Sequence, residues 1–172
     1  LGDVYKRQVA YITTQGFRDV PFIQRGDRRS HYDITWIKTK PLVKRADCYE
    51  VAERLSASGD VVQALDEAVV RDVAARIRES GDIEAVAVCT LFSYIDPAHE
   101  HRIREILAEE LPGMPVSVSY DVLPKWKEYD RASTTIADAY LKPIVSRNFE
   151  RMQKRLDAVS YTHLTLPTTP YV

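Results

Sequence analysis

The chain has 172 residues, which is enough for one ordinary domain with its own hydrophobic core. Hydrophobic residues make up 45% of it and charged residues 28%, the balance of a globular protein. The formal net charge of −1 gives no bulk attraction to nucleic acid or to an anionic membrane, so we expect neither as a partner.

The cysteines and the apolar runs predict a cytoplasmic protein. Cys48 and Cys89 stand apart, with no C-x-x-C pair, which favours a reducing compartment. The longest apolar run, Ala85–Phe92, is too short to span a bilayer. The first residues show no pattern of a secretion signal.

Both ends of the chain differ from the rest. Leu1–Gln8 and Val159–Val172 resemble translated sequencing adapters. The second stretch is rich in Thr, Leu and Pro, and it begins where a highly charged helical pattern stops. We therefore expect residues 1–8 and 159–172 to be artefactual ends, and residues 9–158 to be a partial natural domain cut at both sides. A genuine flexible tail is the alternative for the second stretch.

The first half predicts short strands around a basic, irregular segment. Val9–Thr14 is apolar and β-branched, typical of a buried strand. A short helix can begin near Phe17–Val20 despite the proline that follows, and residues 24–42 read as irregular chain. Cys48–Leu55 is strand-like, and we expect Val61–Ala64 to pair with it across the turn at Gly59.

The middle of the chain predicts a βαβ arrangement. Asp66 can cap a helix with apolar residues at helical spacing, and Gly81 is a natural stop. Glu84–Phe92 is apolar on both faces, as in a central parallel strand. A second helix should follow, capped by Asp96, and Pro115–Ser119 should form the next parallel strand.

The last predicted element is a long helix. Apolar residues recur every three or four positions over Arg131–Asp157, and we expect a kink or break at Pro143. The fold class is therefore α/β, with parallel central strands, flanking helices and a small hairpin insertion.

The sequence contains no familiar site for phosphate or metal. Its glycines are isolated, so neither G-x-G-x-x-G nor G-x-x-x-x-G-K-[S/T] occurs. His99 and His101 are two apart, point to different sides of a helix and lack a third ligand. We expect both to be solvated helix-face residues and expect no metal site.

The junction between the Pro115–Ser119 strand and the last helix is the candidate site. Glu128, Arg131, Thr134 and Thr135 should lie near a helix start beyond the carboxyl end of a strand, where open α/β sheets bind ligands and where helix amides can hold an anion. The alternative is a capping cluster with a buried Glu128–Arg131 pair and Trp126 packed on the core. The residues alone leave both readings open, and they identify no catalytic residue.

Four segments of the chain resemble the N-terminal region of the hydantoinase A/5-oxoprolinase family. They are T-T-Q-G-F-R-D-V (Thr13–Val20), L-D-E (Leu65–Glu67), A-V-A-V-C-T-L-F-S-Y-I-D-P-A-H-E (Ala85–Glu100) and L-P-K-W-K-E-Y-D-R-A-S-T-T-I-A-D-A-Y-L-K-P (Leu123–Pro143). Asp138 stands where many relatives have Asn, which leaves the subfamily open. The resemblance adds Arg18 and Asp19 as residues expected to line the cleft.

The resemblance implies a fold and an activity. It implies part of an actin- and sugar-kinase-like (ribonuclease H-like) lobe of a cytoplasmic enzyme that uses ATP, and a divalent metal, to open cyclic amides such as hydantoins or 5-oxoproline. ATP would activate the carbonyl by phosphorylation. The remainder of the A subunit and a B-type subunit are the implied partners, and the chain alone is expected to be inactive. A ketone carboxylase subunit of the same family and a non-catalytic α/β binding domain are the alternatives.

Overall fold

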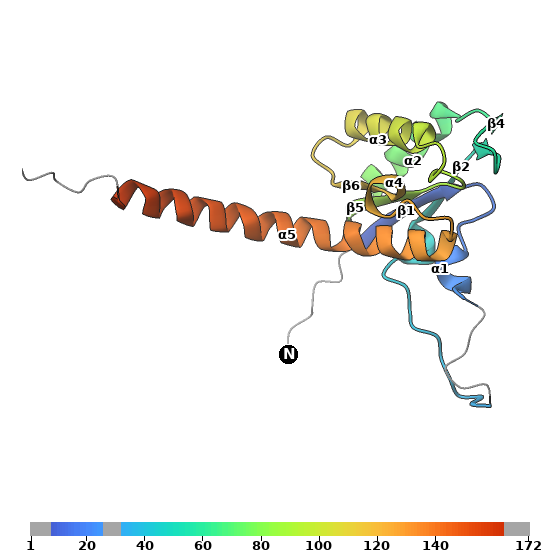
Figure 1. Cartoon of the computed structure of the whole chain (residues 1–172), viewed down its shortest axis with the longest axis horizontal. Coiled ribbons are helices and arrows are strands. Elements are labelled where there is room, and N and C mark those ends of the chain that lie inside the picture. The colour runs from blue at the N-terminus through green and yellow to red at the C-terminus, as the bar shows by residue number, and fades with distance from the viewer. Residues whose placement is uncertain (1–7, 26–31, 164–172) are drawn as a thin grey trace, which may run out of the picture.

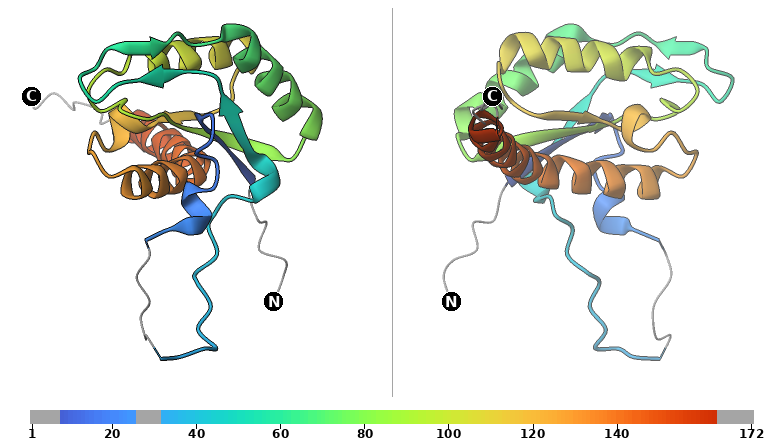
Figure 2. Two further views of the ribbon diagram at one scale, coloured as in Figure 1. Left: turned by 90° about the vertical axis from the view of Figure 1, so that its right-hand side faces the viewer. Right: turned by 60° about the vertical axis from the view of Figure 1, so that its left-hand side comes forward.

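A parallel four-stranded sheet lies between two helical layers in the computed structural model, which describes residues 8–25 and 32–163, with side chains as far as residue 157. The strand order is β2-β1-β5-β6, and every neighbouring pair is parallel. The strands are β1 (Gln8–Thr14), β2 (Cys48–Val51), β5 (Ile83–Cys89) and β6 (Val116–Val118). Helices α2 (Glu67–Ser80) and α3 (Ala98–Glu110) cover one face, and α5 (Glu128–His163) covers the other (Figures 1 and 2).

Side chains of the two central strands alternate between two cores, because successive residues of a strand point to opposite faces. Ala10 and Ile12 of β1 join the core beneath α2 and α3. Val9 and Tyr11 join the core beneath α5, where small residues of β5 such as Ala87 meet the helix. Both faces are buried, so the predicted central parallel strand is confirmed.

Both cysteines pack in the core beneath α5. Cys48 and Cys89 are free, and burial raises the pKa of the Cys48 thiol to about 12. A protonated, buried thiol is unreactive, which fits the expected role of a small apolar filler.

The strand expected over Cys48–Leu55 is wrong as one element. It divides into β2 and β3 (Arg54–Leu55), and β3 forms a separate antiparallel hairpin with β4 (Val61–Gln63). The chain turns between the two strands because Glu53 is fully buried and bonded to other elements, while the Asp66 N–H donates to the Ala52 carbonyl. The hairpin itself is confirmed, and Gly59 holds its turn with φ of 92°.

Helix α2 begins and ends where the sequence predicts. The Asp66 carboxylate accepts hydrogen bonds from the N–H groups of Ala68 at 3.0 Å and Val69 at 3.3 Å. Gly81 ends the helix in the left-handed region, with φ of 67°. Both ends thus satisfy backbone groups that a helix leaves unpaired.

Asp66→Ala is expected to lower the free energy of unfolding by about 1 kcal/mol, because it removes the acceptor for two amides of the first turn. Asp72→Ala is the matched control, since Asp72 is exposed on the same helix and makes no side-chain hydrogen bond within the described part of the chain. Urea denaturation of both variants measures the difference. Equal stabilities would show that the cap contributes nothing.

Helix α3 and the strand after it complete the expected βαβ unit with small shifts. The Asp96 carboxylate accepts from the Ala98 N–H at 2.9 Å, so it caps the helix as predicted. Strand β6 ends at Val118 rather than Ser119. The next residues form one helical turn, α4 (Ser119–Val122), because Ser119 and Tyr120 are drawn to a buried carboxylate of α3.

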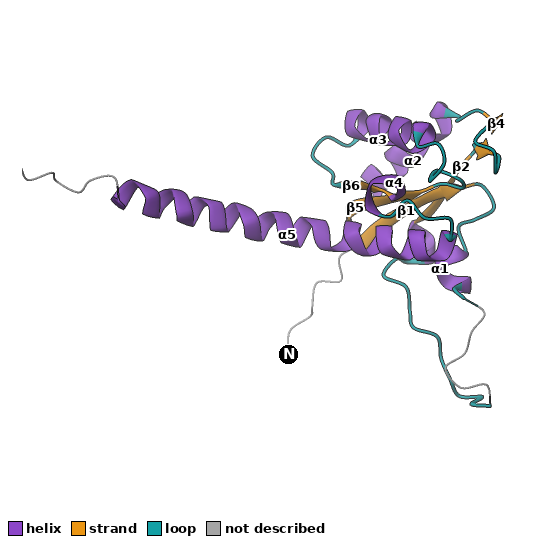
Figure 3. Ribbon diagram, viewed as in Figure 1, coloured by secondary structure: helices purple, strands orange, loops and turns teal. Residues whose placement is uncertain are grey.

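Helix α5 is continuous through Pro143, so of the expected kink or break the break is wrong. It starts at Glu128, three residues earlier than predicted, and runs past the proline to His163. Residues 144–157 are rich in strong helix formers, so the helix resumes after the lost hydrogen bond. Its second half leaves the body of the molecule (Figure 3). Among the described residues, no helix combines the length and apolar character that crossing a bilayer requires.

Between α1 (Val20–Ile23) and the short 3-10 helix at Arg45–Asp47, residues 24–25 and 32–44 form no helix or strand, as predicted, and residues 26–31 lie outside the described residues. Its described part, from residue 32 on, extends away from the body (Figure 3) and exposes Tyr32, Ile34 and Ile37. The predicted ends at 1–8 and 159–172 lie largely outside the described residues. Gln8 belongs to β1, and residues 159–163 belong to α5.

Candidate functional site

Polar side chains gather at the carboxyl edge of the sheet. Strands β1, β5 and β6 are parallel, so Thr14, Thr90 and Ser119 at or beyond their ends meet at one edge. All three residues are buried. In open α/β sheets this edge is where ligands bind.

The first cluster at this edge is built on Glu53. The Thr14 hydroxyl donates to one carboxylate oxygen of Glu53 and accepts the Leu91 N–H at 3.0 Å. His99 Nδ1 lies 2.7 Å from the other carboxylate oxygen. The prediction that His99 is solvated is wrong: its side chain is 12% exposed, because the first turn of α3 packs against the bend after β2.

The second cluster is built on Glu100, which is also fully buried. Its carboxylate accepts from the N–H groups of Thr90 and Tyr120, both at 2.9 Å, and from the Ser119 hydroxyl at 2.6 Å. Burial raises the pKa of Glu100 above its ordinary value. One side chain of α3 thus joins the ends of β5 and β6.

Sequence reasoning missed both carboxylates, although each had left a signal. Glu53 is an acid inside an otherwise strand-like run. Glu100 lies three and seven residues before Ile103 and Leu107, which places it on the buried face of α3. His101, by contrast, is partly exposed and packs edge-to-face on Tyr120.

Arg131 is the largest fully buried side chain in the described structure. Its guanidinium donates to the carbonyls of Thr90 at 2.5 Å and Lys125 at 3.0 Å, and to Cys89 Sγ at 3.3 Å. It also lies over the ring of Tyr94, 5.4 Å from the centroid. Arg131 therefore links the start of α5 to the end of β5 and stabilises the carboxyl edge of the sheet.

The other residues proposed from α5 lie around this anchor. Glu128 is exposed at the first position of the helix, and the hydroxyls of Thr134 and Thr135 donate to the carbonyls of Asp130 and Arg131, each at 2.7 Å. The two hydroxyls are thus bonded within their own helix. The alternative capping cluster is wrong in two respects: Trp126 is 68% exposed instead of packed on the core, and Glu128 is exposed instead of buried in a pair with Arg131.

Arg18 and Asp19 lie in the connection from β1 to α1, apart from Glu128. Asp19 pairs with Arg45 at 2.9 Å. Arg18 lines a polar hollow of about 300 Å³ together with Glu50 and Arg76. The six proposed residues thus share the carboxyl side of the sheet but do not line one cavity.

A second hollow, of about 490 Å³, lies at the start of α5, and we call it the aromatic hollow. It is lined by Arg25, Phe92, Tyr94, Trp126, Lys127, Glu128, Tyr129 and Asp130. Phe92 has φ of 56°, a conformation that costs free energy in a residue other than glycine and that clusters at functional sites. The hydrogen bond from Arg25 lowers the pKa of Asp130, so this carboxylate is charged at neutral pH.

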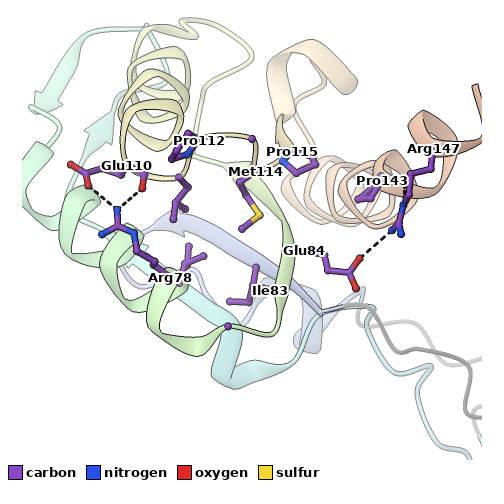
Figure 4. A pocket seen from close by; sticks show the side chains of 13 residues that line it. Arg78, Ile83, Glu84, Glu110, Pro112, Met114, Pro115, Pro143 and Arg147 are labelled. Carbon is purple, nitrogen blue, oxygen red and sulfur yellow. Dashed lines mark hydrogen bonds and ion pairs between the residues drawn. The ribbon is translucent and has the colours of Figure 1, made fainter. Parts of the chain in front are cut away.

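A third hollow lies at the opposite, amino-terminal edge of the sheet (Figure 4) and, at about 650 Å³, is larger than the two described above. Its floor is apolar, with Ile83 and Met114 between the helices. Its charged rim is already paired, by Arg78 with Glu110 at 3.0 Å and by Arg147 with Glu84 at 3.4 Å. Its size would favour this hollow as a binding site, but the charged side chains at its rim are already paired with each other and offer a ligand little polar contact.

The aromatic hollow suits a flat, polar ring. Aromatic faces can stack on such a ring, while Lys127 and Glu128 offer a donor and an acceptor at its rim. Among the residues that the structure describes, no three His, Cys, Asp or Glu side chains gather as metal ligands would. The described residues also form no glycine-rich phosphate cradle.

The chain is a parallel α/β domain with polar residues at the carboxyl edge of its sheet, which is the edge where ligands of open α/β folds commonly bind. The N-terminal region of the hydantoinase/oxoprolinase family matches residues 3–111, and the chain belongs to this family. An uncharacterized protein of Methanocaldococcus jannaschii is 44% identical over 81% of this chain and 20% of its own length. The acetophenone carboxylase gamma subunit of Aromatoleum aromaticum is 33% identical over 90% of this chain and 23% of its own length.

The fold is also that of a solved enzyme. The crystal structure of ATP-dependent caprolactamase from Pseudomonas jessenii matches with a TM-score of 0.81 and 30% identity, over 87% of this chain and 22% of that one. The likeness confirms the expected fold, part of an actin- and sugar-kinase-like α/β lobe. The chain spans about a fifth of the length of these relatives.

Proposed function

We propose that this chain is one part of the A subunit of a cytoplasmic, ATP-dependent enzyme that opens a cyclic amide. Family membership carries the proposal, together with the likeness to an ATP-dependent caprolactamase. ATP and a divalent metal would be held elsewhere in the intact enzyme, and ATP would supply activation of the amide carbonyl. By itself the chain is expected to turn over neither ATP nor substrate.

The aromatic hollow is the proposed contact with the substrate. A cyclic amide is flat around its C–N bond, so it can lie against Tyr94 or Trp126. The exposed Glu128 can accept a hydrogen bond from the amide N–H. Arg131 would position the first turn of α5 and would not contact the substrate, because its guanidinium already binds backbone carbonyls and lies over the ring of Tyr94.

The remaining residues proposed from the sequence take supporting roles. Arg18 and Asp19 would border the same cleft from the β1 side. Thr134 and Thr135 would brace the first turns of α5. The intact enzyme would also contain the remainder of the A subunit and a B-type partner subunit.

A ketone carboxylase is the second candidate, and one observation favours it. The acetophenone carboxylase gamma subunit covers as much of this chain as the caprolactamase structure does, at a similar identity. Both activities need an activated carbonyl, so the aromatic hollow would serve either. Substrate screening with 5-oxoproline, hydantoin, caprolactam, acetone and acetophenone separates the two, whereas a non-catalytic α/β domain would act on none.

Glu128→Gln in the intact subunit is expected to lower kcat/KM for ATP-dependent ring opening about tenfold or more, because a charged acceptor at the substrate is lost. Glu109→Gln is the matched control, since Glu109 is exposed on α3 away from the hollow. Coupled ADP release measures both. Equal rates for the two variants would remove Glu128 from the site, and ring opening by residues 9–158 alone would refute the proposal that this chain is only a part.

A further inference from the structure

The hollow lined by Arg18, Glu50 and Arg76, which we call the polar hollow, brings together charges of opposite sign that do not pair. Its volume is about 300 Å³, at the lower end of the range of small-molecule sites. Within the described part of the chain, neither arginine forms an ion pair, so Glu50 lies beyond ion-pair distance of both. The space between these charges is therefore open to a ligand that carries charges of both signs.

Two of the three charged side chains are held in place by the chain itself. The guanidinium of Arg76 lies over the ring of Tyr49, 5.0 Å from its centroid. One carboxylate oxygen of Glu50 accepts the Gly16 N–H at 2.8 Å, and the other makes no hydrogen bond to the residues that the structure describes. Side chains that are already positioned lose less freedom when a ligand binds, which favours binding.

The polar hollow also has an apolar part. Tyr49 and Ala52 contribute to its lining from β2 and the bend after it, and Val69 contributes from α2. Val69 and Arg76 are seven residues apart, so they share one face of α2 and are separated by about 10 Å along its axis. A short hydrocarbon chain can therefore lie against this lining while its polar ends reach the charged side chains.

Other acidic groups nearby do not line the polar hollow. Asp19 pairs with Arg45 at 2.9 Å, and Asp47 lies before β2. The lining therefore carries two guanidinium groups and one carboxylate. A guanidinium binds a carboxylate with two parallel hydrogen bonds, and a carboxylate accepts hydrogen bonds from an ammonium. The set thus suits a small molecule that has both a carboxylate and an ammonium.

We propose that the polar hollow binds a small amino acid, with the ligand carboxylate on Arg18 and Arg76 and the ligand ammonium on Glu50. The inference rests on the proposed function, because hydrolysis of the C–N bond of a lactam gives one molecule that carries a carboxylate and an ammonium at neutral pH. The polar hollow shares no lining residue with the aromatic hollow. It would thus be a site for the opened product, separate from the contact with the ring.

Calorimetric titration of the intact subunit with 6-aminohexanoate, the amino acid that caprolactam gives on ring opening, tests the site. Arg76→Gln is expected to weaken binding about tenfold, because charge-assisted hydrogen bonds to the ligand carboxylate are lost. Glu50→Gln is expected to remove the preference for 6-aminohexanoate over hexanoate, which lacks the ammonium. Arg71→Gln is the matched control, another exposed arginine of α2 outside the polar hollow, and it should leave Kd unchanged.

Arg18→Gln repeats the test from a different element and should also weaken binding. Three results would overturn the amino acid site: a Kd that Arg76→Gln and Arg18→Gln leave unchanged, a preference for 6-aminohexanoate that survives in Glu50→Gln, or binding of hexanoate or inorganic phosphate as tight as that of 6-aminohexanoate. Ring opening is assayed on the same preparation. A subunit that opens no lactam but shows the expected binding would contradict the proposed function alone, and one that opens lactams without this binding would contradict the amino acid site alone.

Discussion

Arg131→Met is expected to lower the free energy of unfolding by about 3 kcal/mol or more, one of the two largest effects of a single substitution that we predict. Methionine can fill much of the space but cannot donate a hydrogen bond. The Lys125 carbonyl would then lose its side-chain donor, and the buried Thr90 carbonyl would keep only the Ser93 hydroxyl at 3.0 Å. Each hydrogen bond from a charged donor contributes about 1.5–3 kcal/mol, and the contact with the Tyr94 ring is lost as well.

Arg104→Met provides the comparison for Arg131→Met. Arg104 lies on α3, where its half-exposed side chain pairs with Asp121 at 2.6 Å. Surface pairs of this kind contribute about 0–1 kcal/mol, so this variant should remain near the parent in urea denaturation. If the two variants unfold at the same urea concentration, Arg131 does not anchor α5.

The anchoring role changes how activity data on Arg131 should be interpreted. A loss of activity in Arg131→Ala can arise from displacement of the whole first turn of α5, including Glu128. Glu128 is exposed, so its substitution leaves the hydrogen bonds of Arg131 intact. The activity of Glu128 variants therefore tests the contact with the substrate, and the stability of Arg131 variants tests how firmly the start of α5 is anchored.

Periodicity predicted most of the fold. The apolar runs of β1 and β5 and the Asp66 and Gly81 ends of α2 each depend on neighbours in the sequence, and all were located. Of the kink or break expected at Pro143, the break was wrong, because local helix preference beyond the proline outweighs one lost hydrogen bond. The sequence thus predicted the elements whose stabilising contacts lie between residues that are close together in the chain.

The candidate site was predicted less completely, because its contacts span long distances along the chain. Glu53 meets Thr14 and His99, which are 39 and 46 residues away. No local pattern pairs these residues, and the partly buried His99 looked like an ordinary helix-face residue. The sequence placed Glu128 and Arg131 on the correct helix. Only the structure shows that Glu128 is exposed and that the Arg131 guanidinium donates its hydrogen bonds to backbone carbonyls.

The two edges of the parallel sheet differ in the groups that they leave exposed. At the carboxyl edge, Glu53, Glu100 and Arg131 bond to the chain itself, and Arg131 also packs on Tyr94, which lines the aromatic hollow. A site supported by such internal bonds suits binding, because less of it must be ordered when a ligand arrives. Beyond the amino edge, the second half of α5 exposes large hydrophobic side chains such as Phe149 and Leu156 within the part of the chain that the structure describes, and exposed apolar surface of this kind is typical of a contact surface.

Glu100→Ala is expected to lower the free energy of unfolding by about 3 kcal/mol, the second of the two largest effects that we predict. The substitution leaves the buried N–H of Thr90 and the partly buried N–H of Tyr120 without their acceptor, and it leaves a cavity beside the Ser119 hydroxyl. The end of β5 and the start of α4 would no longer share a partner, so the whole carboxyl edge should loosen.

Glu105→Ala on the same helix controls for helix propensity. Glu105 has a side chain 61% exposed and pairs only with Arg102 in the described structure, so its removal should cost well under about 1 kcal/mol. Hydrogen exchange at Thr90 and Tyr120 adds a local readout, because both amides should lose protection in Glu100→Ala and keep it in Glu105→Ala. Protection that survives in Glu100→Ala would mean that other acceptors satisfy these amides, and the buried carboxylate would then have no structural role at the edge.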